Sequence, residues 1–268
     1  MRWVRIYKSA IHHGEEAIVA GNDRAGMVNF SGCHLACRFC YTPETSTYRF
    51  GKDYTEEDFR GVLSDLIARG AGNLNLISPS HEWSCIERSL AEVKQSEGAD
   101  IPLVLKISGY EGQQLVRRMT ALADVIIPDF KVYGSSAAKA VNLPANYSEI
   151  AEKALTVMLE THRESLYSPT GKLTRGILVR HLLMPGFFDD SIRVMETLGG
   201  VGFRGILNLM GHFISPKHHK VHVASDEEMT FLRRLAEQQG MSVLINGKAP
   251  TAVRPNSKIS EVSRASFA

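Results

Sequence analysis

Residues 30–41 read FSGCHLACRFCY and hold three cysteines, Cys33, Cys37 and Cys40, in C-x3-C-x2-C spacing. A secreted disulfide protein would spread its cysteines to close long loops, whereas a tight cluster of reduced thiols indicates metal ligation or redox chemistry. A structural zinc site usually takes four ligands in two pairs, and no second pair is present. Three thiolates suit an iron–sulfur cubane whose fourth iron stays open for a ligand. Zinc, with His34 or Cys85 as a further ligand, and inert cysteines are the alternatives.

The segments around the cysteines alternate between short apolar runs and amphipathic runs. After the apolar run 27–30, we expect strands at 74–77, 102–107, 125–127, 176–183, 206–210 and 243–245. We expect helices at 55–70, 82–93, 111–122, 148–159, 191–198 and 225–239. Repeated strand–helix units predict a parallel sheet with right-handed crossovers and with its chemistry at the carboxyl ends of the strands.

Six such units fall short of a closed eight-stranded barrel, which typically needs about 250 residues. We therefore expect an α/β fold of the partial (β/α)6, TIM-like barrel type over residues 23–246. Residues 1–22 would be an N-terminal extension, and residues 247–268 a C-terminal tail. A doubly wound open sheet is the alternative that the pattern leaves open.

Composition and charge exclude several classes of partner. Of the 268 residues, 31 are basic and 29 acidic, so a net charge of +2 gives no electrostatic case for nucleic acid. No apolar run is long enough to span a bilayer, and the first residues lack the apolar core of a signal peptide. We expect a cytoplasmic protein, monomeric, with no membrane or nucleic-acid partner.

The cysteine spacing, with Phe39 before the last cysteine, resembles the signature of the radical SAM superfamily. Further pieces follow in order at residues 75–81 (NLISPSH), 108–110 (SGY), 128–131 (PDFK) and 179–186 (VRHLLMPG). Over residues 24–215 the order and spacing resemble the pyruvate formate-lyase activating enzyme and its uncharacterised paralogues. The resemblance implies a partial (β/α)6 barrel whose three cysteines are the catalytic and metal-binding residues of a [4Fe–4S] cluster. The open iron would bind S-adenosylmethionine (SAM), and reduction by flavodoxin or ferredoxin would give a 5′-deoxyadenosyl radical.

The same resemblance carries cofactor-binding roles to individual residues. Asp129 and Lys131 match an Asp-x-Lys that holds the methionine end of SAM, which suits a carboxylate facing an ammonium and a lysine facing a carboxylate. Ser108, before a glycine that allows a tight turn, is expected to contact ribose or the methionine carboxylate. Arg180 should point into the barrel and pair with Asp129 or with substrate, and His212 matches a SAM-contacting histidine.

Two positions depart from the pattern. The superfamily usually has Gly-Gly-Glu after the second strand to bind the SAM amino group, and here residues 78–82 read SPSHE. We expect the hydroxyls of Ser78 and Ser80, a backbone carbonyl, or Glu82 to take that role. Lys106 stands where an uncharged polar or an acidic residue is common.

The resemblance implies an oxidoreductase that abstracts hydrogen, and the leading hypothesis is an activating enzyme that acts on a glycine of a partner protein, a glycyl radical enzyme. A radical SAM enzyme acting on a small molecule, a peptide or an RNA base is the alternative, with RNA disfavoured by the weak charge bias. A non-catalytic zinc or iron–sulfur protein is the hypothesis from a different class.

Overall fold

The structure is a computed structural model that describes residues 3–14, 16–19, 24–35, 37–96, 101–214 and 221–248. The strands are β1 (Trp3–His12), β2 (Ala25–Phe30), β3 (Lys52–Thr55), β4 (Asn73–Ile77), β5 (Leu103–Ile107), β6 (Val125–Pro128), β7 (Leu166–Tyr167), β8 (Leu173–Leu182), β9 (Ile206–Met210), β10 (His212–Ile214), β11 (Val221–Val223) and β12 (Ser242–Ile245). The helices are α1 (Pro43–Ser46), α2 (Glu56–Ala68), the 3-10 turn η1 (Ser80–Glu82), α3 (Trp83–Gln95), α4 (Gln113–Leu122), α5 (Ser135–Ala140), α6 (Tyr147–Thr161), α7 (Phe188–Gly200) and α8 (Asp226–Gln238).

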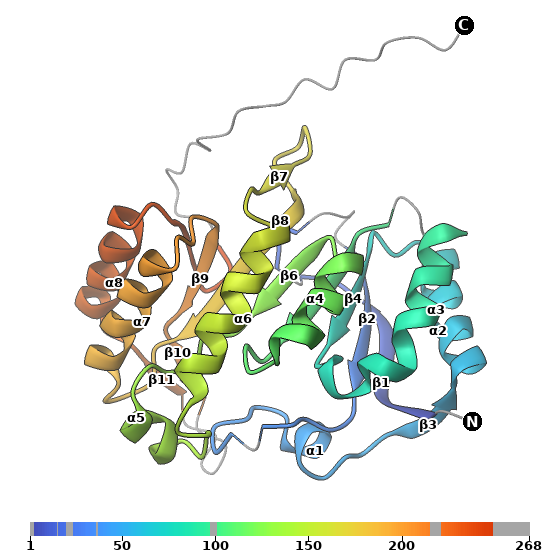
Figure 1. Ribbon diagram of the computed structural model, residues 1–268, viewed down its shortest axis with the longest axis horizontal. Coiled ribbons are helices and arrows are strands. Elements are labelled where there is room, and N and C mark those ends of the chain that lie inside the picture. The colour runs from blue at the N-terminus through green and yellow to red at the C-terminus, as the bar shows by residue number, and fades with distance from the viewer. Residues whose placement is uncertain are drawn as a thin grey trace, which may run out of the picture.

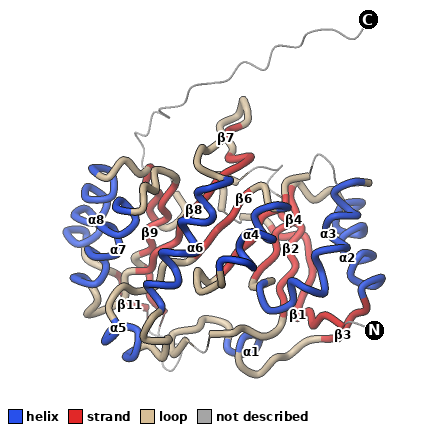
Figure 2. Tube along the Cα trace, in the orientation of Figure 1, coloured by secondary structure: helices blue, strands red, loops and turns tan. Residues whose placement is uncertain are grey.

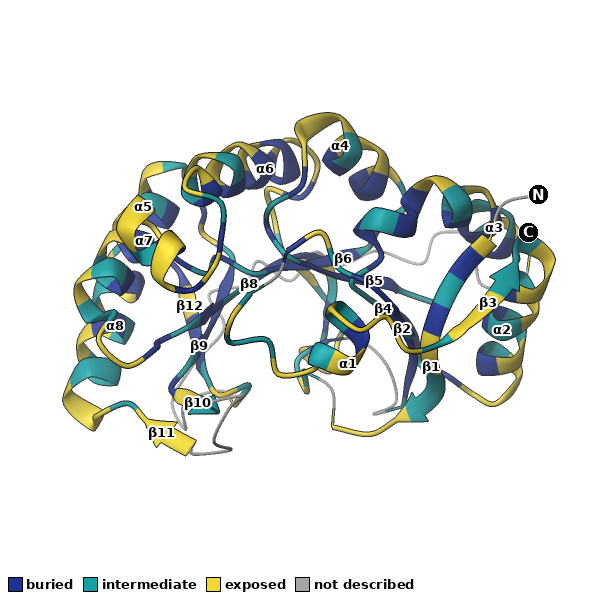
Figure 3. Cartoon of the chain, turned by 90° about the horizontal axis from the view of Figure 1, so that it is seen from below, coloured by how far each residue is buried: buried dark blue, intermediate teal, exposed yellow. Residues whose placement is uncertain are grey.

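One large sheet organises the described residues, in the order β12-β9-β8-β6-β5-β4-β2-β1-β3, with β7 paired to β8. Its strands run parallel from β2 to β12. Seen from below, the sheet is a crescent with the larger helices on its convex side (Figure 3). Among the described strands, β3 and β12 are the two ends of the sheet and do not pair. The expected partial barrel is confirmed.

The N-terminal segment differs from the expectation. Residues 3–12, assigned from sequence to an extension outside the barrel, form β1 of the same sheet, antiparallel to both β2 and β3. Their alternation is irregular, with a register shift between Ile6 and Lys8, which explains why the strand was not apparent from sequence. Of the expected C-terminal tail, only residues 247 and 248 fall within the described residues.

The helices begin and end close to their predicted positions. Thr55 and Asp58 form both hydrogen bonds of a capping box at α2, and Ser225 and Glu228 do the same at α8. The helices turn their apolar stripes toward the convex face of the sheet, which they cover from α2 to α8 (Figures 1 and 2). In the part of the chain described, no helix has both the length and the apolar character needed to cross a membrane.

The half of the concave face nearer the amino ends of the strands is apolar. Strand residues alternate between faces: Leu103 and Leu105 pack under the helices, whereas Val104 belongs to a separate buried cluster on the concave side. We call this cluster the inner floor; it comprises Val19, Val104, Val125, Ile127, Leu173, Leu178, Ile206 and Leu244. Nearer the carboxyl ends on the same face, β5, β6 and β8 each lead to a polar side chain that lines the cavity, Lys106, Asp129 and Arg180 respectively.

The loop between β1 and β2 reaches across to the inner floor. Val19 forms an isolated parallel bridge with Leu173 at the start of β8, and the Leu173 N–H donates to the carbonyl of Ile18 at 2.7 Å. Residues 16–19 therefore lie against the concave face and contribute Val19 to its apolar packing.

Candidate functional site

A cavity of about 480 Å³ lies at the carboxyl ends of the parallel strands. Residues at the ends of β2, β4, β5, β6, β8 and β9 line it, which is where folds of this kind place their chemistry. The sequence-predicted residues that the structure brings together around this cavity are Cys33, Cys37, Phe39, Cys40, Ser78, Ser108, Asp129, Lys131 and Arg180.

The cysteine loop is anchored on both sides of the cavity. The Gly32 N–H donates to the Thr45 carbonyl at 2.8 Å, and the Arg38 N–H donates to the Val141 carbonyl at 2.9 Å. Gly32 has φ +104°, and a Cβ there would lie 2.9 Å from the His81 ring, so a larger residue would displace the loop. These contacts fix Gly32 beside Cys33 and Arg38 beside Cys37, and all three thiols of the loop line the cavity.

The three half-buried thiols fit an iron–sulfur cluster. Burial raises the pKa of the Cys33 thiol, and it raises the pKa of Cys37 to about 11 despite the opposing charge of Lys131. Within the described ranges, no three His, Cys, Asp or Glu side chains converge as ligands of a single metal ion would. Three soft thiols spread along one cavity wall suit the larger cubane, and leave one iron for another ligand.

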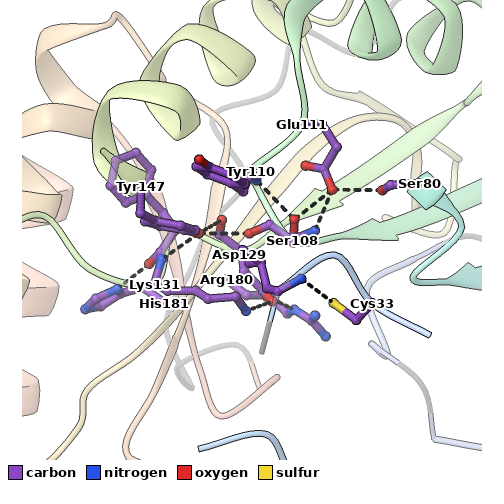
Figure 4. A network of polar contacts seen from close by, with 12 residues as sticks. Cys33, Ser80, Ser108, Tyr110, Glu111, Asp129, Lys131, Tyr147, Arg180 and His181 are labelled. Carbon is purple, nitrogen blue, oxygen red and sulfur yellow. Dashed lines mark hydrogen bonds and ion pairs between the residues drawn. The ribbon is translucent and has the colours of Figure 1, made fainter. Parts of the chain in front are cut away.

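Asp129 lies between two cations opposite the cysteine loop (Figure 4). Arg180 Nε donates to Asp129 Oδ1 at 2.8 Å, and Lys131 Nζ donates to Oδ2 at 2.5 Å. Burial alone would raise the pKa of Asp129, but the charges of Arg180 and Lys131 outweigh it and lower the pKa to about 2. Of the two partners expected for Arg180, Asp129 or substrate, the structure shows Asp129, and the carboxylate is ionised at any physiological pH.

Lys131 also faces the cysteine loop. Its Nζ lies 5.8 Å from the centroid of the Phe39 ring, within the range of a cation–π contact. Burial would lower the pKa of Lys131, but Asp129 reverses the shift and raises it. Phe39 and Lys131 therefore connect the thiol side of the cavity with the carboxylate side.

Ser108 is oriented by a buried carboxylate. Glu111 Oε1 accepts from the Ser108 hydroxyl at 2.8 Å and from its N–H at 3.1 Å (Figure 4). The Ser108 hydroxyl also lies 2.9 Å from His34 Nε2. Ser80 is not on the cavity wall: its hydroxyl donates to the same Glu111 oxygen at 2.8 Å, which turns it away from the position expected from sequence.

Of the two remaining predicted residues, Ser78 lies at the cavity and His212 does not. Ser78 lines the cavity with φ +56°, an uncommon conformation for a residue other than glycine. His212 is exposed at the start of β10 and does not line the cavity, because β10 and β11 form a hairpin apart from the main sheet.

Three residues of the site were missed from sequence. The buried Tyr147 hydroxyl lies 2.8 Å from the Ser108 carbonyl and 3.0 Å from the Asp129 carbonyl, and accepts from the Lys131 N–H at 3.1 Å. The Tyr147 hydroxyl thus joins the ends of β5 and β6. In the sequence, Tyr147 looks like one more member of the apolar stripe of α6, so no pattern distinguishes it. Glu111 is signalled by its spacing from Ser108, which matches a capping box. The third residue is Glu16, which contacts Lys106 and Arg180, and no motif or periodicity in the sequence distinguishes it from other acidic loop residues.

Gly109 is required between these two strand ends. It has φ +81°, and a Cβ would lie 2.0 Å from the Asp129 carbonyl oxygen, so no other residue fits without moving the backbone. This close approach brings Ser108 and Asp129 to the same part of the cavity wall.

Comparison with known proteins supports the same assignment. The family described as a 4Fe-4S single cluster domain matches residues 19–143. A radical SAM methyltransferase from Sphaerobacter thermophilus has 14% identity and a TM-score of 0.60, over 83% of this chain and 65% of that one. SuiB of Streptococcus suis bound to S-adenosylmethionine has 12% identity and a TM-score of 0.54, over 80% of this chain and 47% of that one. Methylornithine synthase (PylB) has 12% identity and a TM-score of 0.51, over 90% and 77%.

This chain thus spans less than two thirds of the methyltransferase and about half of SuiB. A comparison with curated proteins gives no match. At these identities the solved structures show a shared fold, and the family model supplies the iron–sulfur domain that the cysteine spacing predicted. The resemblance seen in the sequence is confirmed: residues 19–143 match the 4Fe-4S single cluster domain, and the fold is the partial barrel of solved radical SAM enzymes.

Proposed function

We propose that this chain holds a [4Fe–4S] cluster through Cys33, Cys37 and Cys40, binds S-adenosylmethionine beside it, and abstracts hydrogen from a substrate. One observation carries the proposal: a single cavity unites the three thiols with the Asp129–Lys131 pair. When bound, the cluster and SAM supply one-electron reductive cleavage of a C–S bond, and the protein positions them and excludes water.

The charged residues of the cavity suit the methionine end of SAM. The Asp129 carboxylate would accept from the ligand ammonium, and Lys131 would exchange its contact with Asp129 for the ligand carboxylate. Arg180 holds the other carboxylate oxygen, so Asp129 keeps its orientation during this exchange. The Ser108 hydroxyl, fixed by Glu111, supplies a further polar contact.

Apolar side chains make up much of the remaining wall. They would keep water from the reacting atoms, a requirement for chemistry through reactive radicals. The residues concerned are Phe30, Leu35, Ile77, Ile107, Leu182, Met184 and Met210.

The test is anaerobic incubation of cluster-reconstituted protein with SAM and dithionite, followed by chromatography for 5′-deoxyadenosine. The proposal expects this product from the wild type and none from C33A, C37A or C40A. A reconstituted protein that stays colourless and binds one zinc would instead show a zinc protein. A brown protein that yields no product, even with flavodoxin as donor, would show that the cluster does not act on SAM.

We further propose an activase-like role, in which the hydrogen comes from a glycine of a partner protein. The sheet is open between β3 and β12, which suits access by a protein loop. The expected electron donor is flavodoxin or ferredoxin, and reduced thiols and such donors favour the cytoplasm. Paramagnetic resonance of the reduced, SAM-loaded protein mixed with a candidate partner should then show a radical on the partner.

A small molecule or a peptide is the second candidate substrate. SuiB has been solved with its precursor peptide SuiA, at 13% identity and a TM-score of 0.51 over 79% of this chain and 44% of that one. A product modified in a peptide, with no radical left on any protein, would favour this candidate over the activase-like role.

A further inference from the structure

Glu16 reaches the charged groups of the site from the side of the amino ends of the strands. It belongs to the segment 16–19, which crosses the concave face and joins β8 at Leu173. Only 10% of its side chain is exposed, although it comes from a loop between β1 and β2. A buried carboxylate at this place needs partners, because burial alone disfavours its charge.

Two cations of the cavity wall meet this carboxylate. Lys106 Nζ lies 2.7 Å from Glu16 Oε2, and Arg180 Nη1 lies 3.6 Å from Glu16 Oε1. Lys106 is 6% exposed on β5, and Arg180 stands on β8. Burial would raise the pKa of Glu16, but Lys106 and Arg180 outweigh it and lower the pKa. Glu16 is thus charged and spans two strands.

The contacts continue from Glu16 to the cysteine side of the cavity. Arg180 uses Nη1 toward Glu16 and Nε toward Asp129, and Asp129 contacts Lys131. We call these five residues the charged wall: Lys106, Glu16, Arg180, Asp129 and Lys131. Positive and negative groups alternate along it, so each internal member lies between two opposite charges. Removing one internal charge therefore takes an ion-pair partner away from two neighbouring charges in a poorly solvated place.

We propose that Glu16 is a positioning residue for the SAM-binding site, because its carboxylate forms ion pairs with Lys106 and Arg180 and orients Arg180 toward Asp129. The inference rests on the proposed function, in which Asp129 receives the ligand ammonium. Glu16 Oε1 holds the Nη1 side of the Arg180 guanidinium while Nε donates to Asp129, so loss of the Glu16 charge would weaken one of the two contacts that orient the arginine. Glu16 itself does not line the cavity, so its effect passes through Arg180.

The experiment compares three variants of the full chain with a reconstituted cluster. E16Q removes the charge at constant shape, E16D keeps the charge, and V19A loosens the same segment without touching the charged wall. Equilibrium binding of SAM and thermal unfolding are measured for each. E16Q should bind SAM about tenfold more weakly, equal to about 1.4 kcal/mol. E16D should restore part of this affinity, and V19A should lower the melting temperature with SAM affinity unchanged.

Equal SAM affinity in E16Q and the wild type would overturn the inference, as would a V19A that loses affinity as much as E16Q. If the wild type itself fails to bind SAM, the proposed function is wrong. The coupling between Glu16 and Lys106 is then tested by the free energies of unfolding of E16Q, K106M and the double variant. A double variant more stable than the sum of the single changes, by at least about tenfold in the unfolding constant, would support a charge-coupled Glu16–Lys106 pair. Additive changes would refute it.

Discussion

The concave face of the sheet has two zones that share the same strands but differ in chemistry. On β5, β6 and β8, the residues Val104, Ile127 and Leu178 belong to the inner floor. The next inward position along the same face, two residues on, carries Lys106, Asp129 or Arg180 of the charged wall. Pleating fixes which side chains point inward, and the position along the strand fixes whether they meet apolar neighbours or the cavity.

This difference separates stability from function. The inner floor removes apolar surface from water, while the cysteine loop and the members of the charged wall other than Glu16 face the cavity. Changes in the cavity zone should abolish cofactor binding and leave the fold standing. Changes in the inner floor should lower the free energy of unfolding and leave cofactor binding unchanged.

The largest expected effect is on the cluster. C37A removes one of three thiols, and two remaining thiols cannot hold three irons of a cubane. We expect loss of the brown colour and of bound iron, measured by absorption and iron analysis after anaerobic reconstitution. C85A is the matched control, because Cys85 lies on α3 and does not line the cavity. Full iron binding in C37A, or its loss in C85A, would contradict the assignment.

The second effect is on SAM affinity. D129N removes the negative charge that lies between Arg180 and Lys131, and with it the proposed acceptor for the ligand ammonium. We expect SAM binding to weaken by at least about 100-fold in equilibrium dialysis, with iron content retained. D65N, at an exposed carboxylate of α2, is the control and should bind as the wild type does. A D129N protein with wild-type affinity would remove Asp129 from the binding site.

The third effect tests the inner floor. Leu178 is fully buried on β8, and L178A should lower the free energy of unfolding by about 2–5 kcal/mol through the lost burial and the cavity left behind. Denaturant unfolding of the cluster-free protein measures this. SAM affinity of the reconstituted variant should stay within about threefold of the wild type. A loss of affinity as large as that of D129N would show that the two zones are not separable.

Much of this arrangement was predictable from sequence because it rests on periodicity and spacing. The strand order along the chain, the capping boxes at Thr55 and Ser225, and the cysteine loop all have local signals. The pairing of Arg180 with Asp129 followed from a charge placed within an inward-facing strand position. Such local patterns predict side-chain placement because successive side chains of a strand point to opposite faces of the sheet.

What sequence did not predict depends on contacts between distant segments. β1 has no clear alternation, and its place in the sheet comes from pairing with β2 and β3. Glu16 looks like one more loop acid until the chain is folded, when it meets Lys106 and Arg180 from strands far along the sequence. Ser80 was predicted to face the cofactor, but Glu111 takes its hydroxyl. Such partners are selected by tertiary packing, which leaves no short-range pattern.

The smallest expected effect is on the pH dependence of the free energy of unfolding, which should differ between variants of the charged wall and variants of the inner floor. The pKa of Asp129 is lowered to about 2 in the folded protein, against about 3.9 in an unfolded chain. A lowered pKa adds stability above the unfolded value, and this is lost as pH falls through the folded value. The shift corresponds to about 2.6 kcal/mol above pH 5 and about half of that at pH 3. The unfolding free energies of wild type and D129N should therefore converge by about 1 kcal/mol between pH 6 and pH 3. The gap between wild type and L178A should stay constant over that range, because no charge changes at the inner floor; a constant gap for D129N would mean that Asp129 is not held as an ion by its neighbours.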